Sequence, residues 1–315
     1  MWLDVPADPW IVLGAAAVEV AIGYPASLHR RAPHPVVWIG GMITWCDRRF
    51  NCDDDTPTTR RILGVLCLVT TMLVAAVAGW LPTLAPEPFA LGLAILIGTL
   101  GLAQRSLFDH VRAVARPLTQ GDLDTARSAV GAIVGRDVAD LDADGVAAAA
   151  LESLAESFND GVVAPIFWFV LAGLPGLFVY KAVNTADSLI GHREPRWRAF
   201  GWASARMDDL MNLVPARIAG GLIALAGGGG WSVMMRDARK HASPNSGWPE
   251  SAMAGALKVR LGGRAAYDGV IVERPLFGDG DGPGVRDLDR GLKVYVTACG
   301  LLWLLLAAGG LAWPR

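Results

Sequence analysis

The class of fold is decided by residues 62–84, ILGVLCLVTTMLVAAVAGWLPTL, a run without a charged side chain. An α-helix needs about 20 apolar residues to cross the roughly 30 Å hydrocarbon core of a membrane. We therefore expect a transmembrane helix here. The composition of the whole chain agrees, because 53% of its 315 residues are hydrophobic and only 18% are charged.

Three further stretches extend this pattern. Residues 87–103 follow a proline-rich turn and, with the first run, predict a transmembrane hairpin. Residues 292–313 are rich in leucine and end in tryptophan, which is typical of a membrane interface. Residues 10–26 are a weaker candidate, since Glu19 interrupts them. A cleaved signal peptide is the alternative there, but no basic leader precedes the apolar residues.

Two more apolar stretches, residues 161–180 and 213–230, are interrupted by prolines or by the glycines at 227–230. If each crossed the membrane once, the polar residues 181–212 would be stranded on the far side. We therefore expect re-entrant or protein-buried helices, which tolerate breaks because neighbouring protein satisfies the freed backbone groups.

The arginines predict the orientation. Pairs of arginines at 30–31, 48–49 and 60–61 precede the hairpin and others follow it, while its turn has none. The positive-inside rule then places residues before 62, and those from 104 onward, in the cytoplasm. We expect cytoplasmic helices in residues 104–160 and a cytoplasmic loop and helix in residues 236–290.

No segment alternates between polar and apolar residues for long enough to predict a sheet. The predicted fold class is all-α: a polytopic integral membrane protein, one domain over residues 1–315, with cytoplasmic helices and re-entrant or broken helices around the site. Asp122 and Asp144 are expected to be helix N-caps.

Composition also excludes some functions. The net charge is −2 without a basic run, so nucleic acid is not an expected partner. The four cysteines form no C-x-x-C pair and are expected to be reduced packing residues. The sequence has no P-loop motif, so any nucleotide chemistry needs another kind of site.

The first group of candidate site residues is Glu152, Glu156 and Asp160, in LESLAESFNDG. Their spacing of four places the carboxylates on one helix face, where they repel unless a cation lies among them. A solvated acidic stripe is the alternative. It is disfavoured by the apolar stretch that follows Asp160, because an unpaired carboxylate is costly there.

The second group lies in residues 180–217, where ionisable and amide side chains alternate with apolar ones. Asn184 and Asp187 share a helix face, as do Asp208 and Asn212. Their oxygens suit Mg²⁺. Three cations there suit phosphate or carboxylate groups: Lys181, Arg206 and Arg217. A structural network of ion pairs is the alternative.

The third group lies in HASPNSGWPESAMAGALKVRLGG, residues 241–263. A loop broken by proline and glycine carries His241, Ser243, Asn245 and Glu250 into an alanine-rich helix. The free N–H groups at that helix start suit an anion. A simple capping loop is the alternative.

The same segments resemble the CobD/CbiB family, across nearly the whole chain. The resemblance rests on ESLAESFNDGVVAPIFW from residue 152, KAVNTADSLIGHR from 181, FGWASARMDDLMNLVPAR from 200 and the segment 241–263, in that order and spacing. HPVVWIGGMI from residue 34 and RSLFDHVRAVARPL from 105 also fit. One departure is Tyr24, in EVAIGYP, where the family has an aspartate, so a role for that aspartate is in question.

The resemblance implies an adenosylcobinamide-phosphate synthase of cobalamin (vitamin B12) biosynthesis, a carbon–nitrogen ligase of the cell membrane. It would join a propionate carboxylate of adenosylcobyric acid to the amine of aminopropanol phosphate or aminopropanol, with ATP as co-substrate and Mg²⁺ as cofactor. The active site would face the cytoplasm. The lipid bilayer, other late enzymes of the pathway and a second copy of the chain are further expected partners.

On this resemblance, the carboxylates that serve Mg²⁺ binding and acid–base catalysis are Glu152, Glu156, Asp160, Asp187, Asp208 and Asp209. Among these, the expected Mg²⁺ ligands are Asp187, Asp208 and Asp209. Substrate and phosphate would be bound by Lys181, Asn184, Arg206, Asn212, Arg217, His241, Ser243, Asn245 and Glu250. The competing functions are a corrinoid or ion transporter and a membrane sensor without catalysis.

Overall fold

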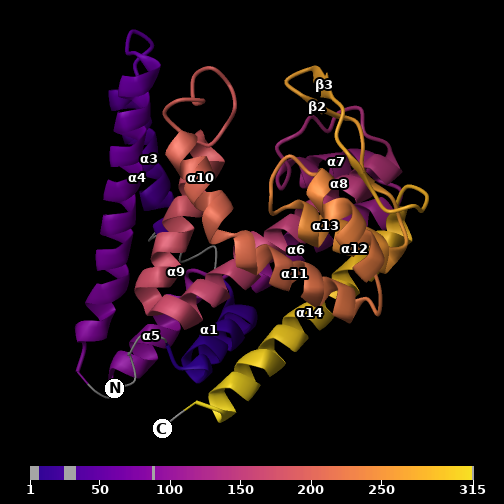
Figure 1. The fold of residues 1–315 in the computed structure, drawn as a ribbon. Coiled ribbons are helices and arrows are strands. Elements are labelled where there is room, and N and C mark those ends of the chain that lie inside the picture. Colours follow the sequence, from indigo (N-terminus) through magenta and orange to yellow (C-terminus); the bar gives the residue numbers. More distant parts are fainter. Residues whose placement is uncertain (1–6, 25–32, 87–88, 314–315) are drawn as a thin grey trace. The chain divides into compact units, whose positions relative to one another are not determined.

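The computed structural model describes residues 7–24, 33–86 and 89–313. These residues are almost entirely helical (Figure 1). The first half of the chain contains α1 (Pro9–Ile22), α3 (Pro35–Phe50), α4 (Pro57–Trp80), the 3₁₀ turn η1 (Leu81–Leu84), α5 (Phe89–Thr99), α6 (Gln104–Thr119), α7 (Leu123–Gly131) and α8 (Ala143–Phe158).

The second half begins with a π-helical turn, η2 (Asn159–Val163), that leads directly into α9 (Ala164–Ile190). The helices that follow are α10 (Trp202–Met211), α11 (Leu213–Ala226), α12 (Trp231–Asp237), the 3₁₀ turn η3 (Ala238–Lys240), α13 (Gly247–Leu257) and α14 (Val285–Leu311). Between α13 and α14 lie four short strands, β1 (Leu261–Gly262), β2 (Ala265–Tyr267), β3 (Val270–Val272) and β4 (Leu276–Phe277).

The strands are an addition to the predicted all-α fold, which is otherwise confirmed. β1 pairs antiparallel with β4, and β2 pairs antiparallel with β3, so that Ala266 lies opposite Ile271. Each strand has only two or three residues. Strands this short are below the length at which a two-residue alternation can be recognised in a sequence.

The chain divides into two packed units. Unit 1 contains Met1–Ala103, Ala164–Asn212 and Leu306–Arg315, and unit 2 contains Gln104–Val163 and Leu213–Leu305. Two of the four boundaries fall inside continuous helical stretches, at the start of α9 and near the end of α14, and the other two fall at the starts of α6 and α11.

Unit 1 is built around the contact of α4 with α9, which also packs against α3 and α10. Two glycines of α4 explain the close packing of this helix. A Cβ atom at Gly64 or Gly79 would lie within 2.6 Å of the backbone oxygen of Phe200 or Leu174, respectively. Small residues of this kind let helix backbones approach each other in membrane proteins.

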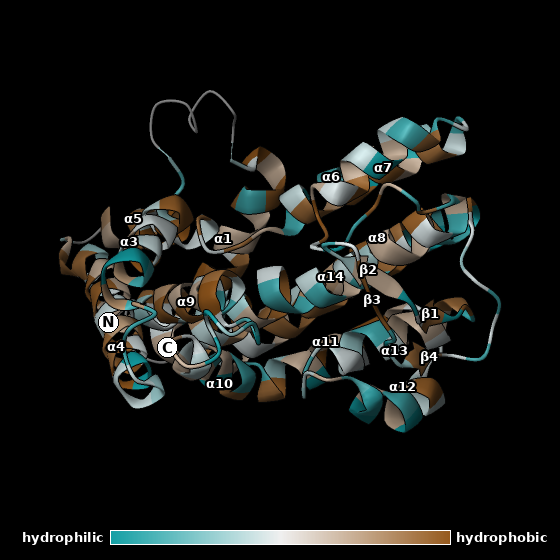
Figure 2. Ribbon diagram, turned by 90° about the horizontal axis from the view of Figure 1, so that it is seen from above, coloured by the Kyte–Doolittle hydropathy of each residue, from teal (hydrophilic) through white to brown (hydrophobic). Residues whose placement is uncertain are grey.

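Unit 2 is built around α13, which packs against α8, α11 and α12. Nearly every side chain of α13 is buried, which explains its run of alanine, glycine and serine. The helix α6 has the predicted two-sided pattern, with Leu107, Val111, Val114 and Leu118 buried. Hydrophilic and hydrophobic residues alternate along α6 and α7 in Figure 2.

Four helical stretches are long and apolar enough to cross a membrane: residues 57–84, 89–119, 143–190 and 285–311. The pair α10 and α11, bent by 50°, would be a fifth, and α1 is a shorter apolar helix. The protein is therefore a multi-pass membrane protein. Of the stretches predicted at 62–84, 87–103 and 292–313, residues 62–84, 89–99 and 292–311 are helical, whereas residues 100–103 and 312–313 are not. Residues 25–26 and 87–88 lie outside the described residues.

The predicted hairpin does not pack as one. α4 packs mainly against α9, whereas α5 packs mainly against α1. The reason is visible in the small residues of α5: Gly98 lies against Ala15 of α1 and against Phe169 of α9. The helices α4 and α5, although consecutive in the sequence, therefore pack mainly against other helices.

The predicted breaks in the apolar stretches are confirmed in part. In α9 the helical conformation is lost at Ala172 and at Gly173, whose φ is +64°. Glycine adopts this left-handed backbone without strain. Pro175, which follows, fits the first turn of the new helical segment.

Of the two predicted N-caps, one is confirmed and one is wrong. Asp122 is confirmed as an N-cap, accepting a hydrogen bond from the N–H of Thr125 at 3.1 Å. The cap of α8 is Asp142 and not Asp144, because the Asp142 backbone is extended and its carboxylate accepts from the Gly145 N–H at 2.8 Å. Asp142 and Asp144 are both residue types that favour an N-cap, so the sequence alone does not distinguish them. The helix begins after Asp142 because that residue has the extended backbone of an N-cap.

Candidate functional site

The three predicted carboxylates of α8 have different surroundings. Glu152 is buried, Glu156 is exposed, and Asp160 is half-buried in the π-helical turn η2. The side-chain amide of Asn159 donates to Asp160 Oδ1 at 2.7 Å. Because a π turn has a wider register than an α-helix, Asp160 does not continue the spacing of four that relates Glu152 to Glu156.

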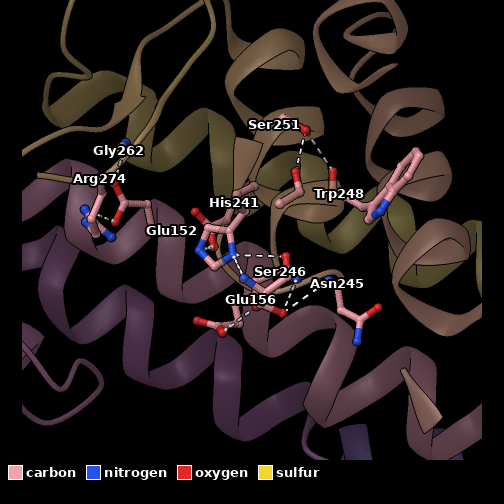
Figure 3. Close-up of polar contacts among 12 residues, drawn as sticks. Glu152, Glu156, His241, Asn245, Ser246, Trp248, Ser251, Gly262 and Arg274 are labelled. Atoms are coloured by element: carbon pink, nitrogen blue, oxygen red, sulfur yellow. Dashed lines mark hydrogen bonds and ion pairs between the residues drawn. The ribbon is translucent and has the colours of Figure 1, made fainter. Parts of the chain in front are cut away.

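Glu152 is held by two arginines. Arg136 and Arg274 both donate to its Oε2, the latter at 3.0 Å, and the N–H of Gly262 donates to Oε1 at 2.8 Å. Figure 3 shows Arg274 and Gly262 meeting this carboxylate. A buried carboxylate with two cations and a backbone donor has its charge compensated, so α8 is joined here to the segment of short strands.

Glu156, one turn further along α8, faces the loop that precedes α13. The hydroxyl of Ser246 donates to Glu156 Oε1 at 2.9 Å (Figure 3). In the same loop Ser243 Oγ accepts from the N–H groups of Asn245 and Ser246. The segment 241–250 thus lies over α8, and the first and third predicted groups of site residues come together.

His241 and Glu250 form the next layer of this cluster. The Ser243 N–H donates to His241 Nδ1 at 2.9 Å, and His241 Nε2 lies 3.8 Å from Glu250 Oε1. Glu250 is 4% exposed. Burial raises the pKa of Glu250 well above its ordinary value, and the nearby carboxylates of Glu156 and Glu152 raise it further.

Asp237 fixes the start of this loop. Its carboxylate is fully buried and accepts from Arg236, from Lys240 at 2.7 Å and from the N–H of Gly278 at 3.0 Å. The hydrogen bonds from Arg236, foremost, hold the pKa of Asp237 well below its usual range. This anchor ties η3 to the residues after β4, four positions before His241.

Arg217 of α11, predicted to contact phosphate, is exposed and lies over the ring of Trp248, 4.6 Å from its centroid. A guanidinium stacked on an indole keeps its donors free at the edge of the plane. Trp248 lies in the first turn of α13, so Arg217 is close to the N-terminal end of that helix. Arg217 therefore belongs to the α13 cluster of unit 2, although its motif lies mainly in unit 1.

In unit 1 the second predicted group meets at Asp208. The amide of Asn184 donates to Asp208 Oδ1 at 3.3 Å, and the amide of Asn212 donates to Oδ2 at 3.0 Å. The hydroxyl of Tyr180, a fully buried residue, donates to Asn212 Oδ1 at 3.1 Å. Asn184 of the first predicted pair and both residues of the second are thus joined in one polar cluster.

The remaining predicted residues of unit 1 lie around this cluster. Asp187 and Lys181 are half-buried on α9. A Cβ atom at Gly191 would lie 1.9 Å from Asp187 Oδ1, so only glycine fits beside this carboxylate. Asp209 accepts from exposed Arg206 at 3.1 Å, which joins a predicted carboxylate to a predicted phosphate contact.

The oxygen donors of this cluster are of the kind that Mg²⁺ prefers, since carboxylate and amide oxygens are hard ligands. Among the described residues, no group of three or more His, Cys, Asp or Glu side chains is arranged to hold a metal ion. A Mg²⁺ site here would therefore rest on one or two carboxylates with amide oxygens, as is common when the ion also binds phosphate.

Sequence reasoning missed the partners of the predicted carboxylates. Arg136 lies in the connection before α8, and Arg274 lies between β3 and β4, more than 100 residues away from Glu152. No spacing rule relates such distant positions. Tyr180 is the first residue of the segment 180–217. Its hydroxyl at the edge of an apolar stretch is the signal that could identify it, because a buried tyrosine hydroxyl usually has a hydrogen-bond partner.

Tyr24, the departure from the family pattern, lies against His34. The two rings meet edge to face with centroids 4.8 Å apart. Pro25 of the same motif lies outside the described residues. An aromatic ring here thus packs against the first residue of the HPVVWIGGMI segment.

Comparison with known proteins places this geometry in context. The chain matches the family described as CobD/Cbib protein over residues 12–295. It is 47% identical over 309 residues to a protein called Cobalamin biosynthesis protein CobD from Rhodobacter capsulatus, covering 95% of this chain and 96% of that relative. Relatives with the same name from Sinorhizobium sp. and Brucella anthropi are 46% and 43% identical, covering 90% and 94% of this chain and 93% and 95% of their own lengths. No solved structure matches the chain.

Proposed function

The chain belongs to the CobD/CbiB family, and on that premise we propose that it is an adenosylcobinamide-phosphate synthase of cobalamin biosynthesis. It would join a propionate carboxylate of adenosylcobyric acid to the amine of aminopropanol phosphate, or of aminopropanol, at the expense of ATP. The observation that supports this reaction most directly is the gathering of the family segments into two polar clusters, around Asp208 in unit 1 and around Glu250 in unit 2.

Amide formation from a carboxylate needs activation, because a carboxylate is a poor electrophile. In the proposed reaction a carboxylate oxygen of the corrinoid attacks the γ-phosphorus of ATP, and the bond to the departing ADP breaks. The amine then forms the C–N bond, and phosphate leaves with the electron pair of the C–O bond. Positioning and charge neutralisation are what the protein must contribute.

The Asp208 cluster is the proposed site for the metal and the nucleotide phosphates. Mg²⁺, when bound, would neutralise phosphate charge there. Asp208 is held in place by two amide donors, so its carboxylate is oriented before any ligand arrives. Asp187 and Asp209 are the further proposed ligands, and Lys181 and Arg206 would bind phosphate groups there. In unit 2, Arg217 is the proposed contact for a phosphate or carboxylate group at the α13 cluster.

The proposed site faces the cytoplasm, where ATP is present. This orientation rests on the arginines that flank α4 and α5 and on the absence of arginine and lysine from the turn between them. It is also the proposed location of further late enzymes of the pathway, which would receive the corrinoid product.

The test is a mass assay with the full-length protein in detergent. Adenosylcobyric acid, aminopropanol phosphate, Mg²⁺ and ATP are incubated with the protein, and the mass of the corrinoid is followed. We expect a gain that corresponds to one amide bond, and no gain without ATP. Substitution Asp208→Asn should slow product formation about 10²-fold or more, because it removes the anionic ligand that would hold Mg²⁺ beside the phosphates.

The matched control is Asp140→Asn, since Asp140 is an exposed carboxylate in the connection between α7 and α8. It should leave the rate unchanged. Bound corrinoid without product under any condition would contradict the proposal and favour a sensor. Movement of corrinoid into vesicles without product would favour a transporter.

A further inference from the structure

Glu250 is unusual among the buried carboxylates of unit 2. It lies in the first turn of α13, after Pro249, and is 4% exposed. Its Oε1 faces His241 Nε2 at 3.8 Å, which is too far for a hydrogen bond. Within the described part of the chain, no group forms a hydrogen bond with Glu250 Oε2. A buried oxygen without a hydrogen bond lowers the stability of the fold. A bound ligand that donates to Glu250 Oε2 would explain why this carboxylate is present.

The ring of His241 is oriented by the loop. Because the Ser243 N–H donates to Nδ1 at 2.9 Å, Nδ1 acts as an acceptor and the hydrogen of the neutral ring lies on Nε2. Nε2, which carries this hydrogen, is the ring nitrogen that lies 3.8 Å from Glu250 Oε1. The two oxygens of Glu250 are therefore distinct: one faces His241, and the other is available to a donor.

The charges around Glu250 are unevenly balanced. Arg136 and Arg274 both face this region, but both donate to Glu152. Glu156 faces the region from the exposed side of α8, held by the Ser246 hydroxyl. The charged and titratable groups around Glu250 are thus the carboxylates of Glu152 and Glu156, the two arginines that donate to Glu152, and His241. A cation placed beside Glu250 and Glu156 would contact an oxygen of each.

We propose, on the basis of the proposed function, that Glu250 and Glu156 bind the ammonium group of the amine substrate and that Glu250 takes the first proton from its nitrogen. The raised pKa of Glu250 supports this role, because a base must hold the proton that it removes. A primary ammonium fits better than a metal ion, since no three ligand side chains of the described residues are arranged around one point.

The proton transfer balances as follows. The ammonium nitrogen gives one proton to the Glu250 carboxylate, which becomes a neutral acid, and the nitrogen lone pair is freed. That pair forms the C–N bond with the activated carboxyl carbon. The phosphate leaves with the electron pair of the C–O bond and accepts the second proton of the nitrogen. Glu250 then returns its proton to water.

The proposal predicts a proton signal on binding, before any chemistry. A carboxyl with a raised pKa holds its proton to higher pH than an ordinary glutamate does, and an ammonium bound beside it favours the ionised form. Binding of aminopropanol phosphate should therefore release a proton, up to about one per ligand. Calorimetric titration of the full-length protein in buffers of different ionisation enthalpy measures this number.

The control ligand is the matching propanediol phosphate, which carries a hydroxyl where the substrate has its ammonium. It should release no proton. Substitution Glu250→Gln should abolish the release with the amine and weaken amine binding about tenfold or more, while binding of the control ligand is unchanged. Release that persists in Glu250→Gln, or equal release with both ligands, would overturn the proposal.

A second variant guards against misfolding. Glu156 is exposed, so Glu156→Gln should fold, and it should weaken amine binding and reduce the proton release, because it removes one acceptor and one like charge. The exposed Glu273→Gln is the matched control and should change neither quantity.

The two proposals fail separately. Amine-linked proton release without corrinoid turnover would leave the ammonium site standing and remove the ligase. Turnover that is unchanged in folded Glu250→Gln would keep the ligase and remove the proton-accepting role. Absence of amine binding to the unsubstituted protein would overturn the ammonium site.

Discussion

Glu152 and Glu250 are two buried glutamates of the same unit, and each is 4% exposed. Glu152 has two arginines and a backbone N–H as partners. Glu250 has a histidine at 3.8 Å on one oxygen and no hydrogen bond from the described residues on the other. Equal burial therefore accompanies opposite electrostatic surroundings.

This difference separates two roles that the sequence pattern could not. A carboxylate whose charge is fully compensated holds elements together, because removing it leaves its cations buried. A carboxylate that is buried without a cation is costly to keep and has a raised pKa, which is typical of residues that move protons. Under our proposal, Glu152 therefore holds elements of the fold together, whereas Glu250 takes part in the chemistry.

The largest expected effect on stability comes from Glu152→Ala. This substitution leaves Arg136 and Arg274 without their buried partner, which typically costs about 3–5 kcal/mol. The transition in thermal unfolding of the detergent-solubilised protein should fall steeply, and the yield of folded protein with it. An unfolding temperature within about a degree of that of the unsubstituted protein would show that Arg136 and Arg274 do not need Glu152 to compensate their charges. That result would contradict the structural role given to Glu152.

A smaller effect of opposite sign is expected from Glu250→Gln. In the unfolded chain this carboxyl titrates near 4.5, and in the folded protein its pKa is well above that value. Between these two pKa values the folded protein binds a proton that the unfolded chain has released. The free energy of unfolding therefore falls as pH rises from the unfolded pKa to the folded pKa. Each unit of difference is about 1.4 kcal/mol.

Glutamine carries no such penalty, so Glu250→Gln should be more stable than the unsubstituted protein at alkaline pH. The advantage should shrink as pH falls toward 4.5 and vanish below it. Thermal unfolding of both proteins over this pH range is the measurement. A variant that is less stable than the unsubstituted protein at every pH would mean that the Glu250 charge is compensated, contrary to our assignment.

The smallest effect is expected from the exposed pair of Arg264 and Glu273 on the short strands. Exposed ion pairs contribute about 0–1 kcal/mol and are screened by salt. Glu273→Gln should therefore shift the unfolding transition little, and less still at high salt. A shift as large as that of Glu152→Ala would show that exposure is a poor guide to the contribution of a carboxylate in this unit.

The sequence was sufficient for the architecture because hydrophobic length is a local property. Residues 62–84 required no knowledge of their neighbours to be identified as a helix long enough to cross a membrane. The packing partners of that helix were a different matter. The close approach of Gly79 to the Leu174 backbone of α9 depends on residues far apart in the chain, so the packing of α4 against α9 and not α5 could not be predicted from either segment alone.

The same limit applies to the site. The spacing of Asn184 and Asp187, and of Asp208 and Asn212, identified segments that do meet, since Asp208 accepts from both amides. The separate roles of Glu152 and Glu250 depended on Arg136 and Arg274, whose sequence context carries no motif. Residue types and spacing predicted segments that do meet in the structure, whereas the surroundings of each carboxylate depend on charge pairing between residues far apart in the chain.

The most direct test of this account is the rate of amide product formation by folded Glu250→Gln, measured by corrinoid mass beside the unsubstituted protein. General acid–base catalysis typically contributes about 10²–10⁴-fold. We predict a variant that is at least as stable as the unsubstituted protein above neutral pH and that forms product about 10²-fold more slowly or worse. A folded variant that forms product at the unsubstituted rate would contradict the account.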